Sequence, residues 1–178
     1  TVFNLITGVY QPTAGAISFA GKSVVGHRPY RITARGIART FQNIRLFPSM
    51  SVLENVMTAC HRHARQSIVD AVFRLPRFVR DEREHREFAV ELLEIFDLAR
   101  FKDEGGTSLP YGNQRRLEIV RALATRPQLL LLDEPAAGMN PSEQEDLMRL
   151  IKEIRDRFGL TILLVEHNMK VVMGVCDR

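Results

Sequence analysis

The sequence predicts an α/β fold in which a mostly helical insertion interrupts a parallel sheet. The apolar runs LLLL at 129–132 and LTILLV at 160–165 have the length of strands buried on both faces of a parallel sheet. An amphipathic helical pattern separates them, which is the strand–helix–strand order of a crossover connection. We therefore expect a sheet core formed by residues 1–47 and 121–178, with a helical subdomain at 48–120.

Local signals predict the elements of the first part of the chain. The apolar residues of TVFNLITG predict the end of a helix that Gly8 closes. The segment AISFAGK at 16–22 alternates like a strand that enters a tight glycine turn. Pro29 at a first helical position and Gly36 at a C-terminal stop predict a short helix between them. IARTF at 37–41 predicts a strand, which the loop QNIRLFPSM follows.

Capping patterns predict where the helices of the insertion begin. Ser51 and Glu54 form a capping box, which predicts a helix from there to about His61. A second helical segment is expected near 66–74, and Pro76 breaks it.

The same pattern at Asp81 and Glu84 predicts the start of a third helix. Its apolar residues fall on one face: Phe88, Leu92, Ile95 and Phe96. The breaker-rich stretch at 103–112 predicts a loop, and a further helix is expected over 113–125, before Pro127.

The last third of the chain alternates between strands and helices. After the buried strand and the loop AAGMN, Pro141 opens an amphipathic helix to about Phe158, and Gly159 ends it. LTILLVEH predicts a second strand buried on both faces, and NMKVVMGV predicts the start of another helix.

Composition indicates an ordinary globular protein and disfavours several function classes. The chain has 178 residues, 45% of them hydrophobic and 26% charged, with a net charge of +4. The basic residues alternate with acids, as in RDEREHRE at 80–87, so we expect a solvated helix face and no nucleic-acid partner. Cys60 and Cys176 form no CxxC pair, which disfavours a zinc site or a disulfide framework and fits a reducing compartment.

No apolar run approaches the roughly 18 residues that a membrane-spanning helix needs. There is no signal-like start, and the first residue is Thr1 rather than Met, so we expect a segment upstream of this sequence.

Two acids follow the first buried strand. Asp133 and Glu134 would lie at its carboxyl end, where open α/β sheets bind their ligands. Asp133 is a candidate ligand of Mg²⁺, because hard cations prefer oxygen ligands. Glu134 is a candidate to orient or deprotonate an attacking water. The alternative is that both acids only begin a loop or cap a helix.

Two further polar residues follow predicted strands. His167 lies after the second buried strand and could contact a phosphate oxygen, although a lone histidine there is usually a surface or capping residue. Gln42 follows the strand IARTF and could bind Mg²⁺ or water through its neutral amide, although alone it indicates nothing.

The segment LPYGNQRRLEIVRAL at 109–123 joins a breaker-rich loop directly to a helix. The free N–H groups of such a helix start predict an anion site for phosphate. Arg115 and Arg116 follow in the first turn, where a purely structural helix more often carries acids.

Together these motifs resemble the ATP-binding-cassette (ABC) ATPases, a family with a P-loop NTPase-like sheet core and an inserted helical subdomain. FQNIRLF resembles the glutamine loop, LPYGNQRR the signature, LLLLDEP the Walker B strand, AGMNP the D-loop and VEH the switch histidine. The resemblance covers essentially the whole chain in family order. It implies ATP hydrolysis, with ATP and Mg²⁺ as cofactors.

By this resemblance, Glu134 and His167 are catalytic, and Asp133 and Gln42 hold Mg²⁺. Contacts to nucleotide come from these two Mg²⁺ ligands and from the signature and D-loop residues Leu109, Pro110, Tyr111, Gly112, Asn113 and Asn140. A second ATPase subunit would bind head to tail, so that Gly112 and Asn113 face the partner's ATP.

A finer resemblance is to the ATPase subunits of branched-chain amino-acid importers. It is carried by GNQRRLEIVRAL, DEPAAGMNP, VEHNMKVVMGVCDR and the long helical insert. It implies transmembrane permease partners, contacted near the glutamine loop and the insert. It also implies a peripheral location on the cytoplasmic face of a prokaryotic plasma membrane.

The sequence departs from the family pattern at several points. The Walker A loop GxxxxGK[ST], which supplies most phosphate affinity, is missing, and the chain looks truncated at both ends, so we expect weak or no activity from it alone. Pro110 replaces the usual signature serine, Tyr111 a glycine and Asn113 a glutamine, while Asn140 replaces the D-loop aspartate.

Three alternatives remain beside this hypothesis. The chain could serve another ABC transporter, importer or exporter, or it could be a non-catalytic fragment that docks on a membrane partner. A DNA-repair or chromosome-structure ATPase would carry a very long coiled-coil insertion, whereas only 66 residues separate Gln42 from Leu109 here.

Overall fold

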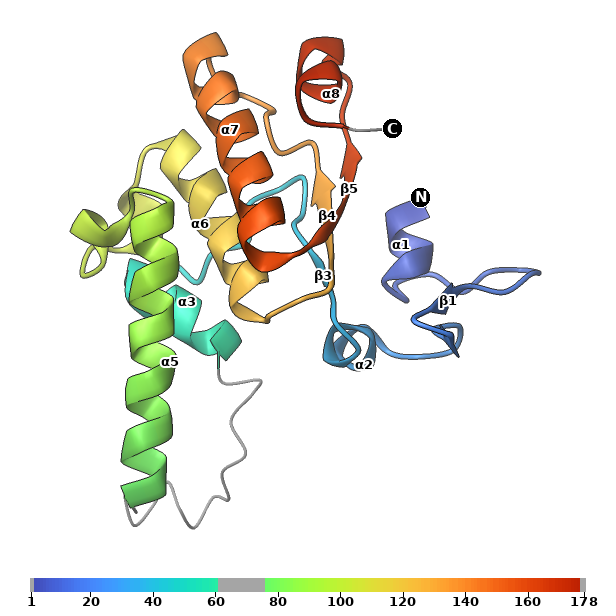
Figure 1. Ribbon diagram of the computed structural model, residues 1–178, viewed down its shortest axis with the longest axis horizontal. Coiled ribbons are helices and arrows are strands. Elements are labelled where there is room, and N and C mark those ends of the chain that lie inside the picture. Colours follow the sequence, from blue (N-terminus) through green and yellow to red (C-terminus); the bar gives the residue numbers. More distant parts are fainter. Residues whose placement is uncertain (1, 61–75, 177–178) are drawn as a thin grey trace.

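The structure is a computed structural model that describes residues 2–60 and 76–176 (Figure 1). Its helices are α1 (Val2–Ile6), α2 (Pro29–Ala34), α3 (Val52–Cys60), α5 (Pro76–Ile95), α6 (Tyr111–Ala124), α7 (Pro141–Phe158) and α8 (Met169–Val175). Its strands are β1 (Ser18–Phe19), β2 (Lys22–Ser23), β3 (Ile37–Arg39), β4 (Leu129–Asp133) and β5 (Thr161–Val165). Short 3₁₀ turns lie at Ala99–Phe101 and Gly106–Ser108.

A three-stranded parallel sheet in the order β3-β4-β5 forms the centre of the fold. Ile37 pairs with Leu129, and Asp133 pairs with Val165, so the carboxyl ends of the strands lie at one edge. The predicted parallel sheet with crossover helices is confirmed. The residues that follow β3, β4 and β5 are consequently neighbours in space although they are far apart in the sequence.

The prediction that β5 is buried on both faces is wrong. Ile162 and Leu164 pack against the main core, but Leu163 is 41% and Val165 38% exposed. β5 is the edge strand, and alternate residues of a strand point to opposite faces, so only one of its faces is covered within the described residues. β4, which has a strand on each side, keeps Leu130, Leu131 and Leu132 fully buried, as a central strand requires.

β3 is shorter than the predicted strand over 37–41. Thr40 still donates its N–H to the Leu131 carbonyl, but the Phe41 N–H turns away to the Glu118 carboxylate on α6. A side chain of another element therefore replaces the sheet partner at this position.

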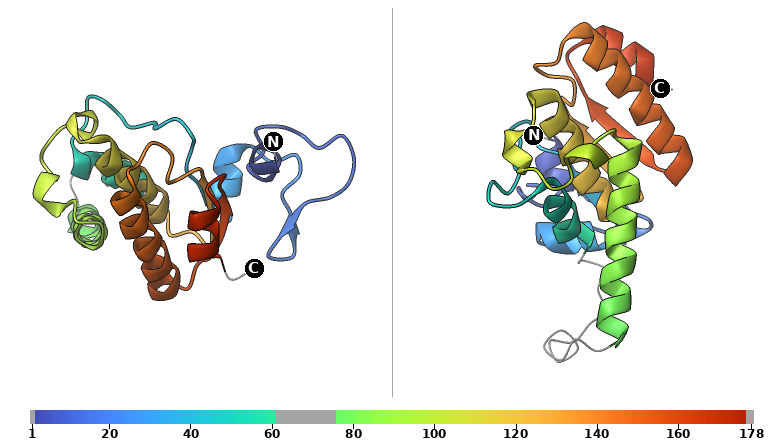
Figure 2. Two further views of the ribbon diagram at one scale, coloured as in Figure 1. Left: turned by 90° about the horizontal axis from the view of Figure 1, so that it is seen from above. Right: turned by 90° about the vertical axis from the view of Figure 1, so that its left-hand side faces the viewer.

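The first part of the chain forms a small unit against one side of the sheet. Phe3, Val24 and Ile32 pack with Ile37 and Leu131 of the sheet in a separate cluster. Figure 2 shows this segment on the side of the sheet opposite α3, α5 and α6. The helix that Gly8 closes, the short helix after Pro29 and the strand entering a glycine turn are confirmed, and the turn continues into a paired strand, β2.

α3, α5 and α6 pack together on the opposite side of the sheet. The predicted capping box of α3 is present: the Ser51 N–H donates to Glu54, and the Glu54 N–H donates to the Ser51 hydroxyl. The predicted end at His61 and the predicted segment at 66–74 lie outside the described residues.

Two helix starts differ from the prediction. α5 begins at Pro76 and runs through Asp81, because proline is favoured in a first turn and the charged residues after it have high helix propensity. α6 begins at Tyr111 rather than 113, since the Gln114 N–H already bonds the Pro110 carbonyl and so draws Gly112 into the first turn.

The main hydrophobic core spans the helices and the sheet without a break. Val56 of α3, Leu92 of α5, Leu117 of α6, Leu132 of β4 and Ile154 of α7 are all buried in the same cluster. α6 crosses the predicted boundary near 120 and contacts both β3 and the other helices. The division into a core at 1–47 and 121–178 and a helical subdomain at 48–120 stays a prediction. Among the described residues, no helix is long and apolar enough to cross a membrane.

Candidate functional site

Glu134 directly follows β4 in an unusual backbone conformation. Its φ is +47°, a left-handed value that non-glycine residues rarely adopt and that costs on the order of 1 kcal/mol or more. The Glu134 N–H donates to the Val165 carbonyl at 2.8 Å, which continues the pairing of β4 with β5 by one residue. This turn directs the side chain out of the sheet edge.

Three of the predicted site residues meet at the Glu134 carboxylate. The Gln42 amide Nε2 donates to Oε2 at 3.1 Å, and His167 Nε2 lies 3.1 Å from Oε1. The Glu134 side chain is 21% exposed, whereas His167 is 84% exposed. The structure therefore brings Gln42, Glu134 and His167 together, as expected for residues that follow three neighbouring parallel strands.

Asp133 faces a cation that the sequence had not indicated. Arg39 Nη2 lies 2.8 Å from the Asp133 carboxylate, and Nη1 donates to Asn4 Oδ1 at 2.6 Å and to Thr7 Oγ1 at 3.3 Å. Arg39 thus joins α1 to the end of β4. The signal in the sequence was a charged residue within the apolar strand IARTF, since a charge in a buried strand needs a partner.

Arg115, which follows the predicted anion site, faces the interior of the fold. Its side chain is completely buried and donates to the carbonyls of Phe41 (2.6 Å), Gln42 (2.9 Å) and Glu134 (3.2 Å). Arg115 also pairs with Glu118 at 2.9 Å. Burial raises the pKa of the Glu118 carboxyl, and the hydrogen bonds from the Phe41 N–H and Arg115 oppose that rise.

The predicted signature residues lie around the first turn of α6. Pro110 and Tyr111 are exposed, Gly112 and Asn113 are half-buried, and Leu109 points into the core instead, with 4% exposure. Within the described residues, Arg115 joins the start of α6 to Glu134 by donating a hydrogen bond to the Glu134 carbonyl.

The signature turn packs against the loop that follows Glu134. The Tyr111 ring lies on Gly138, and the Glu143 carboxylate lies 3.0 Å from where a Cβ on Gly112 would be. Asn140 caps α7: its side chain accepts from the Glu143 N–H at 2.9 Å, and Glu143 accepts from the Asn140 N–H at 3.0 Å. The structure thus occupies Asn140 with capping, and its predicted contact with nucleotide stays a prediction.

Glu166 is a further residue that the sequence analysis missed. One carboxylate oxygen accepts from the Ala136 N–H at 3.0 Å, and the other accepts from the N–H groups of His167 and Asn168. Glu166 therefore ties the loop after β4 to the loop after β5. No pattern in the sequence distinguishes it from an ordinary strand-end acid.

The segment AISFAGKS at 16–23 is close to the phosphate-loop pattern GxxxxGK[ST], with Ala16 in place of the first glycine. Its structure does not suit that role. Gly21 lies in a hairpin turn, and Lys22 and Ser23 form β2, paired antiparallel with β1. A phosphate loop requires a helix start, whose N–H groups face the anion, and here a strand follows instead.

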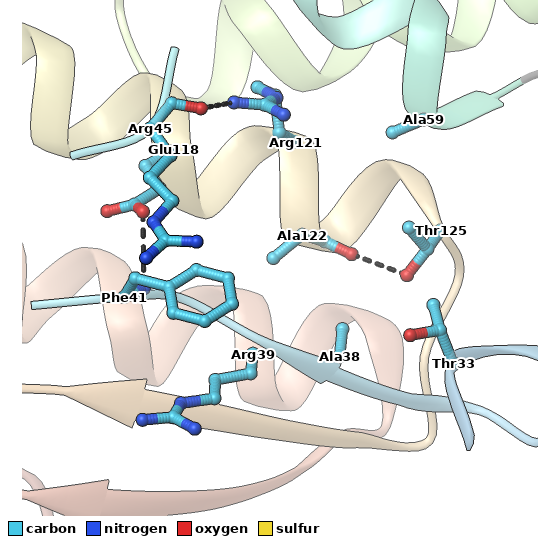
Figure 3. A pocket seen from close by; sticks show the side chains of 10 residues that line it. All are labelled: Thr33, Ala38, Arg39, Phe41, Arg45, Ala59, Glu118, Arg121, Ala122 and Thr125. Atoms are coloured by element: carbon cyan, nitrogen blue, oxygen red, sulfur yellow. Dashed lines mark hydrogen bonds between the residues drawn. The ribbon is translucent and has the colours of Figure 1, made fainter. Parts of the chain in front are cut away.

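A pocket of about 200 Å³ lies beside the loop that follows β3 (Figure 3). Arg39 and Arg45 stack on either side of the Phe41 ring, 5.1 and 4.7 Å from its centroid. Arg121 on α6 donates to the Arg45 carbonyl, and burial lowers the pKa of Arg121. Three arginines against one glutamate, Glu118, make the lining basic.

Comparisons with known proteins show the family of the chain. Residues 1–137 match the family described as ABC transporter. One relative is the high-affinity branched-chain amino acid transport ATP-binding protein BraF of Pseudomonas aeruginosa. The sequence identity is 47% over the whole of this chain, and the match covers 70% of BraF.

Two solved structures are also similar. An ATP-binding cassette of an ABC transporter in its ADP conformation has a TM-score of 0.80 and 30% identity, over 99% of this chain and 68% of that one. A dimeric cassette in a post-hydrolysis state, bound to ADP and phosphate, has a TM-score of 0.79 and 26% identity, over 98% of this chain and 72% of that one.

Proposed function

The chain belongs to the ABC transporter family of ATP-binding proteins, and we propose that it powers an importer of branched-chain amino acids by hydrolysing ATP. The observation that carries the proposal is the convergence of Gln42 and His167 on Glu134. It occurs in a chain that is 47% identical to BraF over all 178 of its own residues. The solute class comes from that relative, because the solute-binding parts of such a system lie in other subunits.

The geometry around Glu134 supports a role in activating water. A carboxylate at a sheet edge, with two neighbours on its two oxygens, can accept a proton from an attacking water and hold that water in line. His167, which is highly exposed, can contact the γ-phosphate. The side chain of Gln42 is a neutral amide, so Gln42 carries no charge of its own that needs a partner when it moves away from Glu134.

Asp133 and Gln42 offer the oxygen ligands that suit Mg²⁺. Asp133 is one-fifth exposed at the sheet edge, and the Arg39 guanidinium contacts one of its two carboxylate oxygens, Oδ2, at 2.8 Å. Mg²⁺, when bound with nucleotide, neutralises the charge that develops on the phosphates. Asp133 and Gln42 would hold it beside Glu134.

The start of α6, where Tyr111 is exposed and Gly112 and Asn113 are half-buried, supports a second subunit as partner. ABC cassettes dimerise, as in the dimeric cassette with ADP and phosphate described above. In a head-to-tail pair, Gly112 and Asn113 at the start of α6 would face the partner's ATP, with Tyr111 and Asn140 beside them. The N–H groups of this first turn would supply the anion site.

The basic pocket of Figure 3 is our candidate contact for the permease. It lies between the loop after Gln42 and the helices, and Arg39, Arg45 and Arg121 line it. Its excess of positive charge suits a permease segment that carries an acidic side chain. Bound to the permease, this chain would lie peripherally at the cytoplasmic face of a prokaryotic plasma membrane.

The test is a chimera in which this chain replaces the matching 70% of BraF. The BraF parts that remain supply the segments without a counterpart here, and uptake of labelled leucine is measured in cells that lack BraF. The matched control is Glu145→Gln, an exposed acid on α7 that pairs with Lys170. We expect transport by the chimera, its loss in Glu134→Gln with ATP binding retained, and normal transport in Glu145→Gln.

The outcomes separate the parts of the proposal. Unchanged ATP hydrolysis in Glu134→Gln would refute the assignment of the catalytic base. Hydrolysis without leucine uptake would refute the solute class and favour another ABC transporter. Assembly with the permease but no ATP binding would favour a non-catalytic docking role.

A further inference from the structure

We propose that Arg115 is a positioning residue that links the first turn of α6 to Gln42 and Glu134. Its role in ATP hydrolysis rests on the proposed function, but its contacts are independent of that function. Arg115 lies two residues after Asn113 and touches neither water nor the exposed edge of the site. It acts through the backbone of other residues.

The hydrogen bonds of Arg115 are made to the backbone segments that carry the site side chains. Nη2 donates to the carbonyls of Gln42 and Glu134, and Nη1 donates to the carbonyl of Phe41. Glu118, one turn further along α6, accepts from the Phe41 N–H at 3.2 Å. The pair therefore holds both the N–H and the carbonyl of Phe41, immediately before Gln42.

The two charges of this pair are not needed for stability in themselves. A buried ion pair loses its hydration, and apolar residues of similar volume often replace such a pair without loss of stability. Glu134, by contrast, keeps its strained φ of +47° only because surrounding contacts determine it. The Val165 carbonyl holds the N–H of Glu134, and Arg115 holds its carbonyl, so Arg115 completes that constraint.

Arg115 directly follows the first turn of α6, which contains Gly112 and Asn113. Adjacent turns of a helix move together because backbone hydrogen bonds join them. When nucleotide on the partner subunit displaces that turn, Arg115 carries the displacement to the Gln42 and Glu134 carbonyls. The nucleotide of one subunit would in this way adjust the hydrolytic residues of the other.

The test uses the 178-residue chain and needs no nucleotide. The double variant R115M/E118L removes both charges and leaves apolar side chains of comparable size, while R115K keeps the charge but loses the planar fork. The matched control is R157M/E91L, which removes a half-exposed Arg–Glu pair of 2.7 Å between α7 and α5. The readouts are the urea midpoint and the ¹H–¹⁵N signals of the Gln42 side-chain amide and the Phe41 and Glu134 backbone amides.

We expect all three signals to shift in R115M/E118L and the Gln42 amide to broaden. The urea midpoint should fall, because the Phe41 N–H and the carbonyls of Phe41, Gln42 and Glu134 lose their partners. R115K should shift the same signals, and R157M/E91L should leave them in place. In the BraF chimera, R115K should lower kcat at least tenfold with little change in the KM for ATP.

Signals at their parent positions in R115M/E118L would overturn the proposal, as would equal shifts in R157M/E91L. Should the double variant fail to fold, the R115K spectrum decides in the same way. Failure of the chimera to hydrolyse ATP would refute the proposed function but would leave the spectroscopic result standing.

Discussion

The ring of Tyr111 lies against the bare backbone of Gly138. A Cβ on Gly138 would be 2.9 Å from Tyr111 Cε1 and 3.4 Å from Cζ, closer than packed carbon atoms allow. Gly138 also has a φ of +75°, which favours glycine. The tyrosine that replaces a small residue in the signature is therefore matched by a glycine in the loop after Glu134.

Gly138→Ala should reduce the free energy of unfolding more than Gly159→Ala does. Both glycines have left-handed φ values, which cost an alanine on the order of 1 kcal/mol. A Cβ added to Gly159 would meet no atom within 4 Å, whereas one added to Gly138 would meet the tyrosine ring. We therefore expect about 1 kcal/mol of additional loss in Gly138→Ala. Urea unfolding of the two variants measures the difference.

A double-mutant cycle with Tyr111→Ala isolates the ring contact. In that background, Gly138→Ala should cost no more than Gly159→Ala, because only the backbone term remains. An equal cost of Gly138→Ala in both backgrounds would show that the ring moves aside freely.

Asn140→Ala should destabilise the chain by about 1 kcal/mol through loss of the α7 cap. Asn140→Asp should retain the stability, because a carboxylate accepts the same Glu143 N–H and suits the positive end of the helix. The urea midpoints of the two variants test this role without nucleotide. Equal loss in both variants would contradict capping as the source of the stability.

Arg39→Met should loosen α1 and leave the helical side of the fold unchanged. The substitution removes the bonds to Asn4, Thr7 and Asp133, although the methionine can still pack on the Phe3 ring, on which Arg39 now stacks at 5.4 Å. We expect amide exchange in residues 2–8 to rise at least tenfold.

Hydrogen exchange followed by mass spectrometry measures this effect. Arg83→Met, which removes an exposed ion pair with Glu87 within α5, is the control and should change no exchange in α1. Protection of α1 that survives Arg39→Met would assign its docking to the apolar cluster alone.

Cys60 should make the stability depend on pH in the alkaline range. Burial raises the pKa of its thiol from 9.0 to about 11. Because the thiol ionises at a lower pH in the unfolded chain than in the folded one, its contribution to the free energy of unfolding depends on pH. That contribution is fully present below pH 9 and is lost as the pH rises through 11. The loss should be about 2 kcal/mol.

Cys60→Ala is the comparison that isolates this group, because all other titrating residues remain. The difference in unfolding free energy between the parent and Cys60→Ala should shrink between about pH 8 and pH 11. A difference that stays constant over that range would contradict the burial of the thiol as the cause.

The sequence was sufficient for the order and type of most elements. Periodicity, prolines, glycines and capping boxes act within a few residues, so they predicted α2, β4, α7 and the start of α3 close to their observed bounds. Local patterns did not decide where α5 begins, because Pro76 and Asp81 both suit a helix start. The structure shows that the helix begins at Pro76 and continues through Asp81.

The site was predictable in part for the same reason. Asp133 ends a strand, and Gln42, Glu134 and His167 follow strands. Parallel strands bring their carboxyl ends to one edge whatever the side chains are. The role of Arg115 could not be predicted, because a position near a helix start is the same whether the side chain faces phosphate or the interior. Its complete burial depends on acceptors about 73 residues away in sequence.

By itself, the sequence determined the parallel sheet, the helices and the family to which their motifs belong, because short-range patterns encode them. Only the tertiary structure decided that Arg39 neutralises Asp133 across 94 residues, that Glu134 takes a left-handed turn and that one face of β5 is open. These features depend on which polar groups lose water and which partners then satisfy them, and that is settled only when distant segments pack together.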